Sequence, residues 1–351
     1  MASSSCAVSP SVRTELLNPI SNRFLAPSRV YHQPRSKCEM INRRGFALKG
    51  IMASGASVMG SSLTSEPVKE WRDYHSSQTD TITGHGEVGK YIMYNIPELA
   101  KNYKVYAIDL LGFGWSEKAI IEYDAMIWRD QVVDFLKEIV KEPAVLVGNS
   151  LGGFTALVAA VGLPEQVVGL VLLNNAGQFG DTKAKNTKSE ETFLQKTILK
   201  PLKEIFQRVV LGVLFWQAKQ PNRIESVLKN VYINTSNVDD YLVESIKMPA
   251  NDPNAGEVYY RLMTRFMLNQ TEYTLDSFLS KLTCPLLLLW GDLDPWVGPA
   301  KANRIKEFYP NTTVVNLQAG HCPHDEVPEL VNKALTDWLS NLLTKASLQT
   351  A

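Results

Sequence analysis

Apolar and polar residues follow two alternating patterns in this chain from about residue 94 onward. Short apolar runs bounded by turn-forming residues predict buried strands, and apolar residues every three or four positions predict helices. The predicted strands are Val105–Leu110, Ala144–Gly148, Gly169–Leu173, Pro285–Trp290 and Thr312–Leu317. The predicted helices are Tyr123–Val140, Phe154–Val161, Ala300–Phe308 and Pro328–Leu342. Strands alternating with helices are typical of a mostly parallel sheet flanked by helices, so the sequence predicts an α/β fold.

Residues 177–280 interrupt this alternation. The segment is rich in Lys and Asn at first and then has the pattern of several helices, with no buried strand between them. It lies between the third and fourth predicted strands. We therefore expect a helical cap (lid) over residues 177–280, inserted into a core formed by residues 66–176 and 281–351.

The first 65 residues differ in composition from the rest of the chain. They contain 13 serines, and residues 1–50 hold eight Lys or Arg against two acidic residues. This composition is typical of an organelle transit peptide, so we predict a disordered leader over residues 1–65 and a location in the chloroplast, in the stroma or at the thylakoid. Arg43 and Arg44 precede a weakly apolar run at residues 51–60, which leaves the thylakoid lumen as a weaker alternative. An untargeted disordered tail is the other interpretation.

Charge and composition exclude several classes of protein. The chain has 36 basic and 36 acidic residues, and the part beyond Ser65 is slightly acidic with no basic stripe, which argues against nucleic acid as a partner. No apolar run reaches the roughly eighteen residues of a spanning helix. The four cysteines form neither a C-x-x-C motif nor a disulfide framework, so we expect no metal site and a reducing compartment.

The strongest chemical motif is G-N-S-L-G at residues 148–152, directly after a predicted strand and before a helix of small residues. A G-x-S-x-G sequence in this position predicts a nucleophile elbow, a turn so sharp that only small flanking residues avoid clashes. Such a turn exposes the hydroxyl of Ser150 and directs the backbone N–H of Leu151 at a developing oxyanion. Ser150 is therefore the predicted nucleophile, with Leu151 as one oxyanion donor.

A serine nucleophile requires a base and an acid that orients the base. In elbow enzymes the chain order is serine, acid, histidine. The fourth predicted strand ends in G-D-L-D-P, where Asp294 is the predicted acid and Asp292 is interpreted as a turn residue. The base is predicted to be His321, 27 residues later and just after the last strand. We interpret His324 as a loop residue that shapes the site.

Two further features have structural interpretations. Cys322 lies beside the predicted base, but it has no elbow of its own, so we do not expect thiol chemistry. The sequence D-L-L-G-F-G-W-S at residues 109–116 contains glycines that suggest a phosphate loop. Without a third glycine this motif is weak, and we interpret it as a tight turn with Asp109 in a structural role.

Together, D-L-L-G-F-G-W-S, G-N-S-L-G-G, W-G-D-L-D and G-H-C-P-H-D-E resemble the α/β-hydrolase superfamily. The resemblance covers residues 94–176 and 281–340 and is greatest to plant plastid members of the pheophytinase and chlorophyll dephytylase type. It implies a cap after the third strand and a catalytic triad of Ser150, Asp294 and His321. It also implies an apolar strand ending in an H-G-x-G loop, between the strands at Val105 and Ala144, which supplies the second oxyanion N–H.

This chain departs from that pattern before residue 94. Residues 66–93 are polar, and G-H-G-E-V-G at residues 84–89 has no buried apolar strand leading into it. We expect that the central strand is missing through truncation, or that residues 79–86 replace it. Glu87 would stand where the second donor belongs, which leaves that donor unidentified and predicts weak activity.

These residues predict a serine hydrolase that cleaves an apolar or lipid-like carboxylic ester, with a phytyl ester as one candidate. Two alternatives remain: a truncated, weakly active or inactive protein that binds an apolar ligand without turnover, and a C–C bond hydrolase. No metal or cofactor is required by this chemistry. The apolar run at residues 209–216 predicts either the lining of a lipid-like channel or ordinary helix packing, and peripheral contact with a thylakoid or envelope membrane is a candidate partnership.

Overall fold

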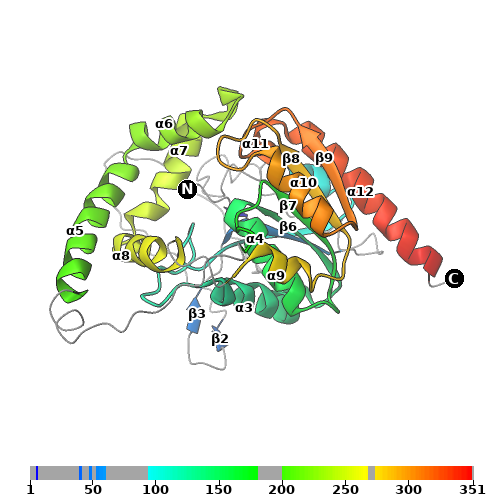
Figure 1. Cartoon of the computed structure of the whole chain (residues 1–351), viewed down its shortest axis with the longest axis horizontal. Helices are drawn as coiled ribbons and strands as arrows, with labels where there is room; N and C mark the ends of the chain where they lie inside the picture. Colours follow the sequence, from blue (N-terminus) through cyan, green and yellow to red (C-terminus); the bar gives the residue numbers. More distant parts are fainter. Residues whose placement is uncertain are drawn as a thin grey trace, which may run out of the picture.

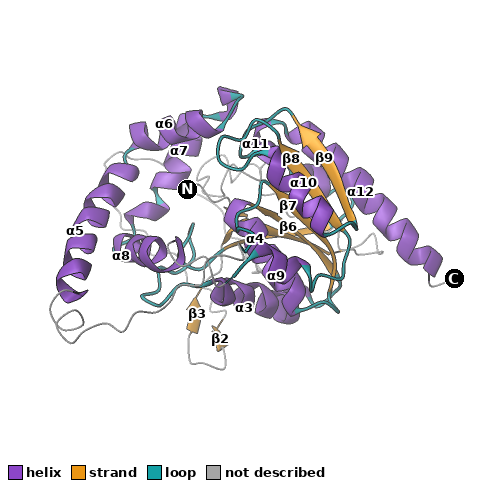
Figure 2. Cartoon of the chain, in the orientation of Figure 1, coloured by secondary structure: helices purple, strands orange, loops and turns teal. Residues whose placement is uncertain are grey.

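The computed structural model describes residues 94–180, 200–267 and 273–349. It also describes four short strands nearer the N-terminus, which are β1 (Ser5–Cys6), β2 (Glu39–Ile41), β3 (Ala47–Lys49) and β4 (Ala53–Gly60). β2 and β3 pair with each other as a separate antiparallel hairpin. The remaining strands belong to one central sheet, with helices on both of its faces (Figures 1 and 2).

The five strands predicted from apolar runs all form in this sheet. They are β5 (Lys104–Asp109), β6 (Ala144–Asn149), β7 (Val167–Leu173), β8 (Leu286–Gly291) and β9 (Thr312–Leu317). Strands β6, β7, β8 and β9 are parallel neighbours in that order. The predicted α/β-hydrolase architecture is therefore confirmed, and the carboxyl ends of these strands meet at one edge of the sheet.

Strands β6, β7 and β8 are almost entirely apolar because both faces of the sheet are covered there. Successive side chains of a strand point to opposite faces. Leu170 and Leu172 of β7 accordingly pack into one core with Trp128 of α3, whereas Val171 packs into the other with Leu335 of α12. The two cores hold the sheet between two layers of helices.

One layer contains α3 (Ala125–Phe135), α4 (Ser150–Gly162), α9 (Leu275–Leu279) and α10 (Pro299–Phe308). The other contains α2 (Ile96–Leu99) and α12 (Pro328–Gln349). Local sequence sets these boundaries. Asp124 caps α3 by accepting hydrogen bonds from the backbone N–H groups of Met126 and Ile127. The helix then continues as a π-helical turn, Leu136–Val140, which ends at Lys141 in the left-handed conformation (φ 59°).

Between β7 and β8 lies a group of helices, which we call the inserted helices. They are α5 (Lys200–Ala218), α6 (Pro221–Val231), α7 (Asp240–Lys247) and α8 (Ala255–Arg261), with short 3-10 turns at Thr235–Asn237 and Pro249–Asn251. The π-helical turn Leu262–Met267 follows α8. These helices lie within residues 177–280, where the sequence predicts a helical cap. Figure 1 shows α5 at the outer edge of the molecule, far from α12.

The sheet position between β5 and β6 is occupied, contrary to the expectation of a missing strand. β4 pairs antiparallel with β5 on one side and with β6 on the other. The expected replacement, residues 79–86, lies outside the described residues. β4 comes instead from residues 53–60, within the segment that we predicted to be a disordered leader. Backbone hydrogen bonds, which do not depend on side-chain type, allow this weakly apolar segment to complete the sheet.

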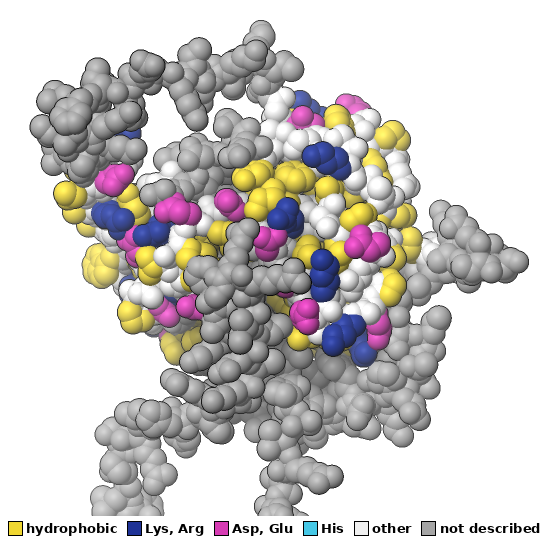
Figure 3. All heavy atoms as spheres, turned by 90° about the horizontal axis from the view of Figure 1, so that it is seen from below, with side chains coloured by type: hydrophobic (Ala, Val, Ile, Leu, Met, Phe, Trp, Pro, Cys, Tyr) yellow, Lys and Arg dark blue, Asp and Glu magenta, His cyan; other side chains and the backbone are white. Residues whose placement is uncertain are grey.

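The surface of the described part carries charges of both signs. On the face seen in Figure 3, acidic and basic side chains are interspersed among apolar ones. Within the same residues, no helix is long and apolar enough to cross a bilayer.

Candidate active site

Ser150 lies at the junction of β6 and α4, as the elbow motif predicts. Its backbone φ is +52°, in the left-handed region that a residue with a side chain seldom adopts. Strain of this kind is found at functional positions, where the surrounding structure holds it in place. Leu151 is the next residue of α4, and backbone N–H groups in the first turn of a helix have no partner within the helix.

The glycines of the motif allow the chain to turn this tightly. A Cβ atom on Gly148 would lie 2.3 Å from the carbonyl oxygen of Gly152. A Cβ atom on Gly153 would lie 2.8 Å from the carbonyl oxygen of Gly148. Both distances are shorter than any side chain can tolerate, so β6 and α4 can approach each other only with glycine at these positions.

Asp294 and His321 form a short polar contact at the centre of the site. Asp294 follows β8 and His321 follows β9, and because these strands are parallel neighbours the two loops lie together. The Nδ1 atom of His321 lies 2.6 Å from Oδ2 of Asp294, and both residues are buried. An ionised carboxylate can only accept, so Nδ1 carries the proton and Nε2 is left free to act as a base.

The pKa of Asp294 favours this ionised form. Burial acts to raise the pKa of this carboxyl group, but the hydrogen bond and charge of His321, together with the backbone N–H groups of Trp296 and Val297, hold it below its ordinary value. The hydrogen bond from Trp296 N to Oδ1 is 2.7 Å long. The carboxylate is therefore charged at neutral pH and held by donors on both oxygens.

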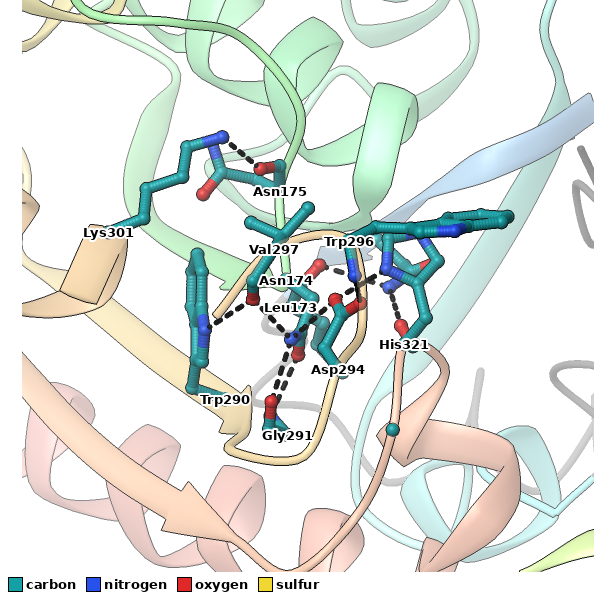
Figure 4. A network of polar contacts seen from close by, with 12 residues as sticks. Leu173, Asn174, Asn175, Trp290, Gly291, Asp294, Trp296, Val297, Lys301 and His321 are labelled. Atoms are coloured by element: carbon teal, nitrogen blue, oxygen red, sulfur yellow. Dashed lines mark hydrogen bonds and ion pairs between the residues drawn. The ribbon is translucent and has the colours of Figure 1, made fainter. Parts of the chain in front are cut away.

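Asn174 connects this carboxylate to the sheet (Figure 4). Its side-chain nitrogen donates to Oδ2 of Asp294 at 2.9 Å and to the carbonyl oxygen of Gly291 at 3.0 Å. Its side-chain oxygen accepts from the N–H of Gly291 at 2.8 Å. Asn174 is completely buried at the end of β7 and has a φ of +37°. It therefore fixes the start of the Asp294 loop against the neighbouring strand.

Lys301 and Trp296 complete the surroundings of the acid and the base. Lys301 Nζ donates to the carbonyl oxygens of Asn175 and Gly177, at 2.7 and 2.6 Å. Burial lowers the pKa of Lys301 to about 8, although the charge of Asp294 acts in the opposite direction. The ring of Trp296 packs edge-on against His321 with centroids 5.0 Å apart and shields the imidazole from solvent on that side.

The histidine loop is bonded directly to the inserted helices. His321 N donates to the carbonyl oxygen of Val231, the last residue of α6, at 2.9 Å. The buried carboxylate of Glu326 accepts from Gly320 N at 2.9 Å and from Ile233 N at 2.8 Å. One side chain thus bridges the loop that carries the base and the segment that follows α6.

The structure brings Asp294 and His321 together, and it places Ser150 nearby through its neighbour. Asn149 donates from Nδ2 to the carbonyl oxygen of His321 at 2.8 Å. Within the described residues, Ser150 Oγ forms no hydrogen bond with the imidazole of His321. Such contacts are often long in enzymes without substrate. Residues 84–89, where the second oxyanion donor was sought, lie outside the described residues.

The remaining candidates have the environments of structural residues. Cys322 is buried, and burial with the nearby Asp325 carboxylate raises the pKa of its thiol, so the reactive thiolate is disfavoured. Burial and the proximity of His321 lower the pKa of His324 to about 4, which keeps this imidazole neutral. Asp109 is fully buried, and its Oδ2 accepts from Trp115 N at 2.8 Å in the tight turn after β5.

A mainly apolar cavity of about 460 Å³ lies between the inserted helices and the core. Leu151, the predicted oxyanion donor, forms part of its wall, so the cavity reaches the elbow. Leu214 and Phe215 of α5 line it from the opposite side. A cavity of this size accommodates a small-molecule ligand with a substantial apolar part. Among the described residues there is no cluster of His, Cys, Asp and Glu suited to a metal ion.

Comparison with known proteins identifies the family. Residues 82–328 match the family described as "alpha/beta hydrolase fold". The chain belongs to this family. α/β-Hydrolases bring a serine, an acid and a histidine together at the carboxyl edge of the sheet. In this member, Ser150, Asp294 and His321 follow β6, β8 and β9 in that order.

Individual relatives differ in their reactions. The chain is 29% identical over 299 residues to the chloroplastic pheophytinase of Arabidopsis thaliana. The matched region covers 74% of this chain but only 60% of the pheophytinase. It is 26% identical over 277 residues to Lipase 3 of a Moraxella species, covering 75% of this chain and 81% of the lipase. It is 48% identical over 83 residues to a 2-hydroxymuconate semialdehyde hydrolase of a Pseudomonas species. This match covers 23% of this chain and 29% of that hydrolase.

Among solved structures, a meta-cleavage product hydrolase from Pseudomonas fluorescens superposes with a TM-score of 0.56. It is 19% identical and covers 73% of this chain and 87% of that chain. At this identity the likeness concerns the fold alone. The relatives therefore indicate a hydrolase, and they include both ester hydrolases and hydrolases of other bonds.

Sequence reasoning did not assign three residues that support the site. Asn174 stands at the end of β7, where the sequence offers no acid, and its amide links two strand ends. Trp296 follows the acid by two residues, and Glu326 follows the base by five. Glu326 directly follows His324 and Asp325, so the local sequence does not single it out as the residue with a buried backbone partner.

Proposed function

We propose that this protein is a serine hydrolase that cleaves an apolar carboxylic ester, with Ser150 as nucleophile, His321 as base and Asp294 as the orienting acid. The observation that carries the proposal is the short contact between Nδ1 of His321 and Oδ2 of Asp294, beside a strained Ser150. This pair fixes the tautomer that a base for serine requires.

In the proposed reaction, Ser150 Oγ attacks the ester carbonyl carbon while Nε2 of His321 takes the hydroxyl proton. The imidazolium formed is stabilised by the Asp294 carboxylate. Collapse of the tetrahedral intermediate breaks the bond to the alcohol, which leaves with the proton from His321. Water, activated by the same base, then releases the acid and restores Ser150.

The developing oxyanion is proposed to accept a hydrogen bond from Leu151 N–H at the start of α4. The positive end of the helix dipole lies there and adds to this stabilisation. The second donor stays unassigned, and residues 84–89 are one candidate region for it. Glu87 in that region would oppose negative charge, so we expect a slower enzyme than one with an H-G-x-G loop.

The substrate is proposed to carry a large apolar group. The cavity behind Leu151 is lined mainly by aliphatic and aromatic side chains of α5, α6 and α8. Apolar chains gain about 0.8 kcal/mol per buried methylene group, so a long chain would be retained and a short one would not. A phytyl ester is one candidate, and the chloroplast is the proposed location because of the relative found there and the leader composition.

A fluorophosphonate probe tests the proposal, because it phosphonylates a serine only when a neighbouring base activates it. We expect labelling of the full chain, mapped to the peptide containing Ser150, and loss of labelling in Ser150→Ala. The matched control is Ser340→Ala on the exposed face of α12, which keeps full labelling. Labelling absent from a folded wild type would instead favour an apolar-ligand-binding protein without turnover.

The second candidate is C–C bond hydrolysis. It is favoured by the 48% identity over 83 residues to a 2-hydroxymuconate semialdehyde hydrolase. The same three residues would serve, so labelling does not separate the two activities. Turnover of a 2-hydroxy-6-oxohexa-2,4-dienoate with no hydrolysis of p-nitrophenyl esters would favour this candidate.

A further inference from the structure

The outer face of α5 carries a stripe of large apolar side chains. Ile205, Phe206, Val209, Val213 and Trp216 are between 52% and 68% exposed. At about 100° per residue, these five side chains fall within one arc of about 100° around the helix. Single exposed apolar residues are common on proteins, but a contiguous stripe of this kind marks an interaction surface. Figure 1 shows α5 at the edge of the molecule.

The opposite face of α5 already has its packing partners. The ring of Phe215 packs on Tyr259 of α8 with centroids 5.3 Å apart. Arg208 forms an ion pair with Glu257 and lies over the ring of Tyr260, 4.2 Å from its centroid. The helix is therefore anchored by its inner face, and no rearrangement is needed to present the stripe.

The charges beside the stripe are basic. By helical position, Lys203 borders one side of the stripe, while Glu204 falls on the opposite side of the helix. At the other border, the ammonium group of Lys219 lies toward the inner face, 5.8 Å from the centroid of the Phe215 ring, and donates to Asn251 Oδ1 at 3.4 Å. Lys219 continues the last helical turn, since its N–H donates to the carbonyl oxygen of Phe215. An apolar face containing Trp and Phe, with the exposed Lys203 at one border, is typical of helices that lie in the interface of anionic bilayers.

We propose that α5 docks on the surface of an anionic lipid bilayer, with this stripe in the interfacial layer. The cavity lies directly behind the docked helix, because Leu214 and Phe215 line it from the inside. An apolar ester could then pass from the bilayer to Ser150 without crossing water. Docking does not depend on the proposed hydrolase activity. Only the entry route of the ester rests on that proposed activity.

Co-sedimentation of the full chain with vesicles tests the docking. We expect binding to mixed phosphatidylcholine and phosphatidylglycerol vesicles and weaker binding to phosphatidylcholine alone or at high salt. Val209→Glu should reduce the bound fraction by roughly tenfold, because a carboxylate would enter the interface. The matched control is Leu330→Glu on α12, at an aliphatic residue that is 53% exposed against 62% for Val209, and this variant should bind as the wild type does.

Two controls keep docking separate from folding and from catalysis. Ser150→Ala should bind vesicles as the wild type does, so a failed hydrolase proposal leaves this result unaffected. Val209→Glu should melt at the wild-type temperature. Equal vesicle binding by Val209→Glu and the wild type would overturn the proposal. Light scattering that shows a dimer for the wild type and a monomer for Val209→Glu would also overturn the proposal, because the stripe would then join two copies of the chain.

Discussion

At the residue scale, the choice between two nearby aspartates defines the proposed triad. Asp292 accepts from Asn316 Nδ2 at 2.6 Å in an exposed turn, whereas Asp294 is buried against His321. The sequence predicted this difference, because G-D-L-D-P places one acid in the turn and the other after it. The sequence could not predict that Asn174 holds Asp294, since that contact joins residues 120 positions apart.

The two aspartates are therefore expected to respond differently to loss of charge. Asp294→Asn replaces the carboxylate with an amide whose NH2 can donate to Nδ1 and favour the wrong tautomer of His321, and we expect kcat for a p-nitrophenyl ester to fall by about 10³–10⁴-fold. Asp292→Asn serves as the matched control and should change kcat by less than about tenfold. A larger loss in Asp292→Asn than in Asp294→Asn would show that the acid is misassigned.

Asp109 gives a second prediction at this scale, on stability rather than activity. Burial raises the pKa of Asp109 to about 7, with the N–H of Trp115 and the charge of Lys118 acting in the opposite direction. Below pH 4 the carboxyl is protonated in the folded and the unfolded chain. Between pH 4 and 7 it is ionised mainly in the unfolded chain, so its contribution to stability falls as pH rises.

The Asp109→Asn variant should remove this dependence. The free energy of unfolding of the wild type should decrease relative to the variant between pH 4.5 and 7 by up to roughly 3 kcal/mol. Denaturant unfolding at a series of pH values measures the difference. Parallel curves for the two proteins across this range would contradict the assigned pKa.

At the scale of elements, apolar patterning predicted the strands and helices of the core, and small residues predicted the elbow. β4 was not predicted, because A-S-G-A-S-V-M-G at residues 53–60 has neither the alternation nor the aliphatic content of a central strand. Its place is fixed by backbone pairing with β5 and β6, which are distant in sequence. A leader ending at residue 65 would contain β4, so a mature chain that keeps this sheet must begin before Ala53.

A proline in β4 tests whether this strand stabilises the sheet. Ser57 pairs with Ala107 of β5 and Val147 of β6, so Ser57→Pro should remove a backbone donor and lower stability by about 3 kcal/mol or more. Ser62→Pro, beyond the end of the strand, is the matched control. Thermal melts of the wild type, Ser57→Pro and Ser62→Pro measure this difference in stability. Equal melting temperatures would mean that β4 contributes no stability to the sheet.

At the scale of the whole molecule, the inserted helices and the core meet at the cavity and at the histidine loop. The sequence predicted an insertion between the third and fourth strands from the loss of strand patterning. It could not predict that Val231 and Ile233 bond to the loop carrying His321 and to Glu326, because these contacts depend on tertiary packing. Movement of the inserted helices is therefore expected to displace the proposed base as well as open the cavity.

The most direct test of the central claim is the hydrolysis of a p-nitrophenyl ester by the wild type, Ser150→Ala, His321→Ala and the double variant. Because the three residues act as a unit, each single change should reduce kcat about as much as the double change does. Thermal melts confirm that all four proteins are folded. Hydrolysis retained by a folded Ser150→Ala protein at the wild-type rate would contradict the account.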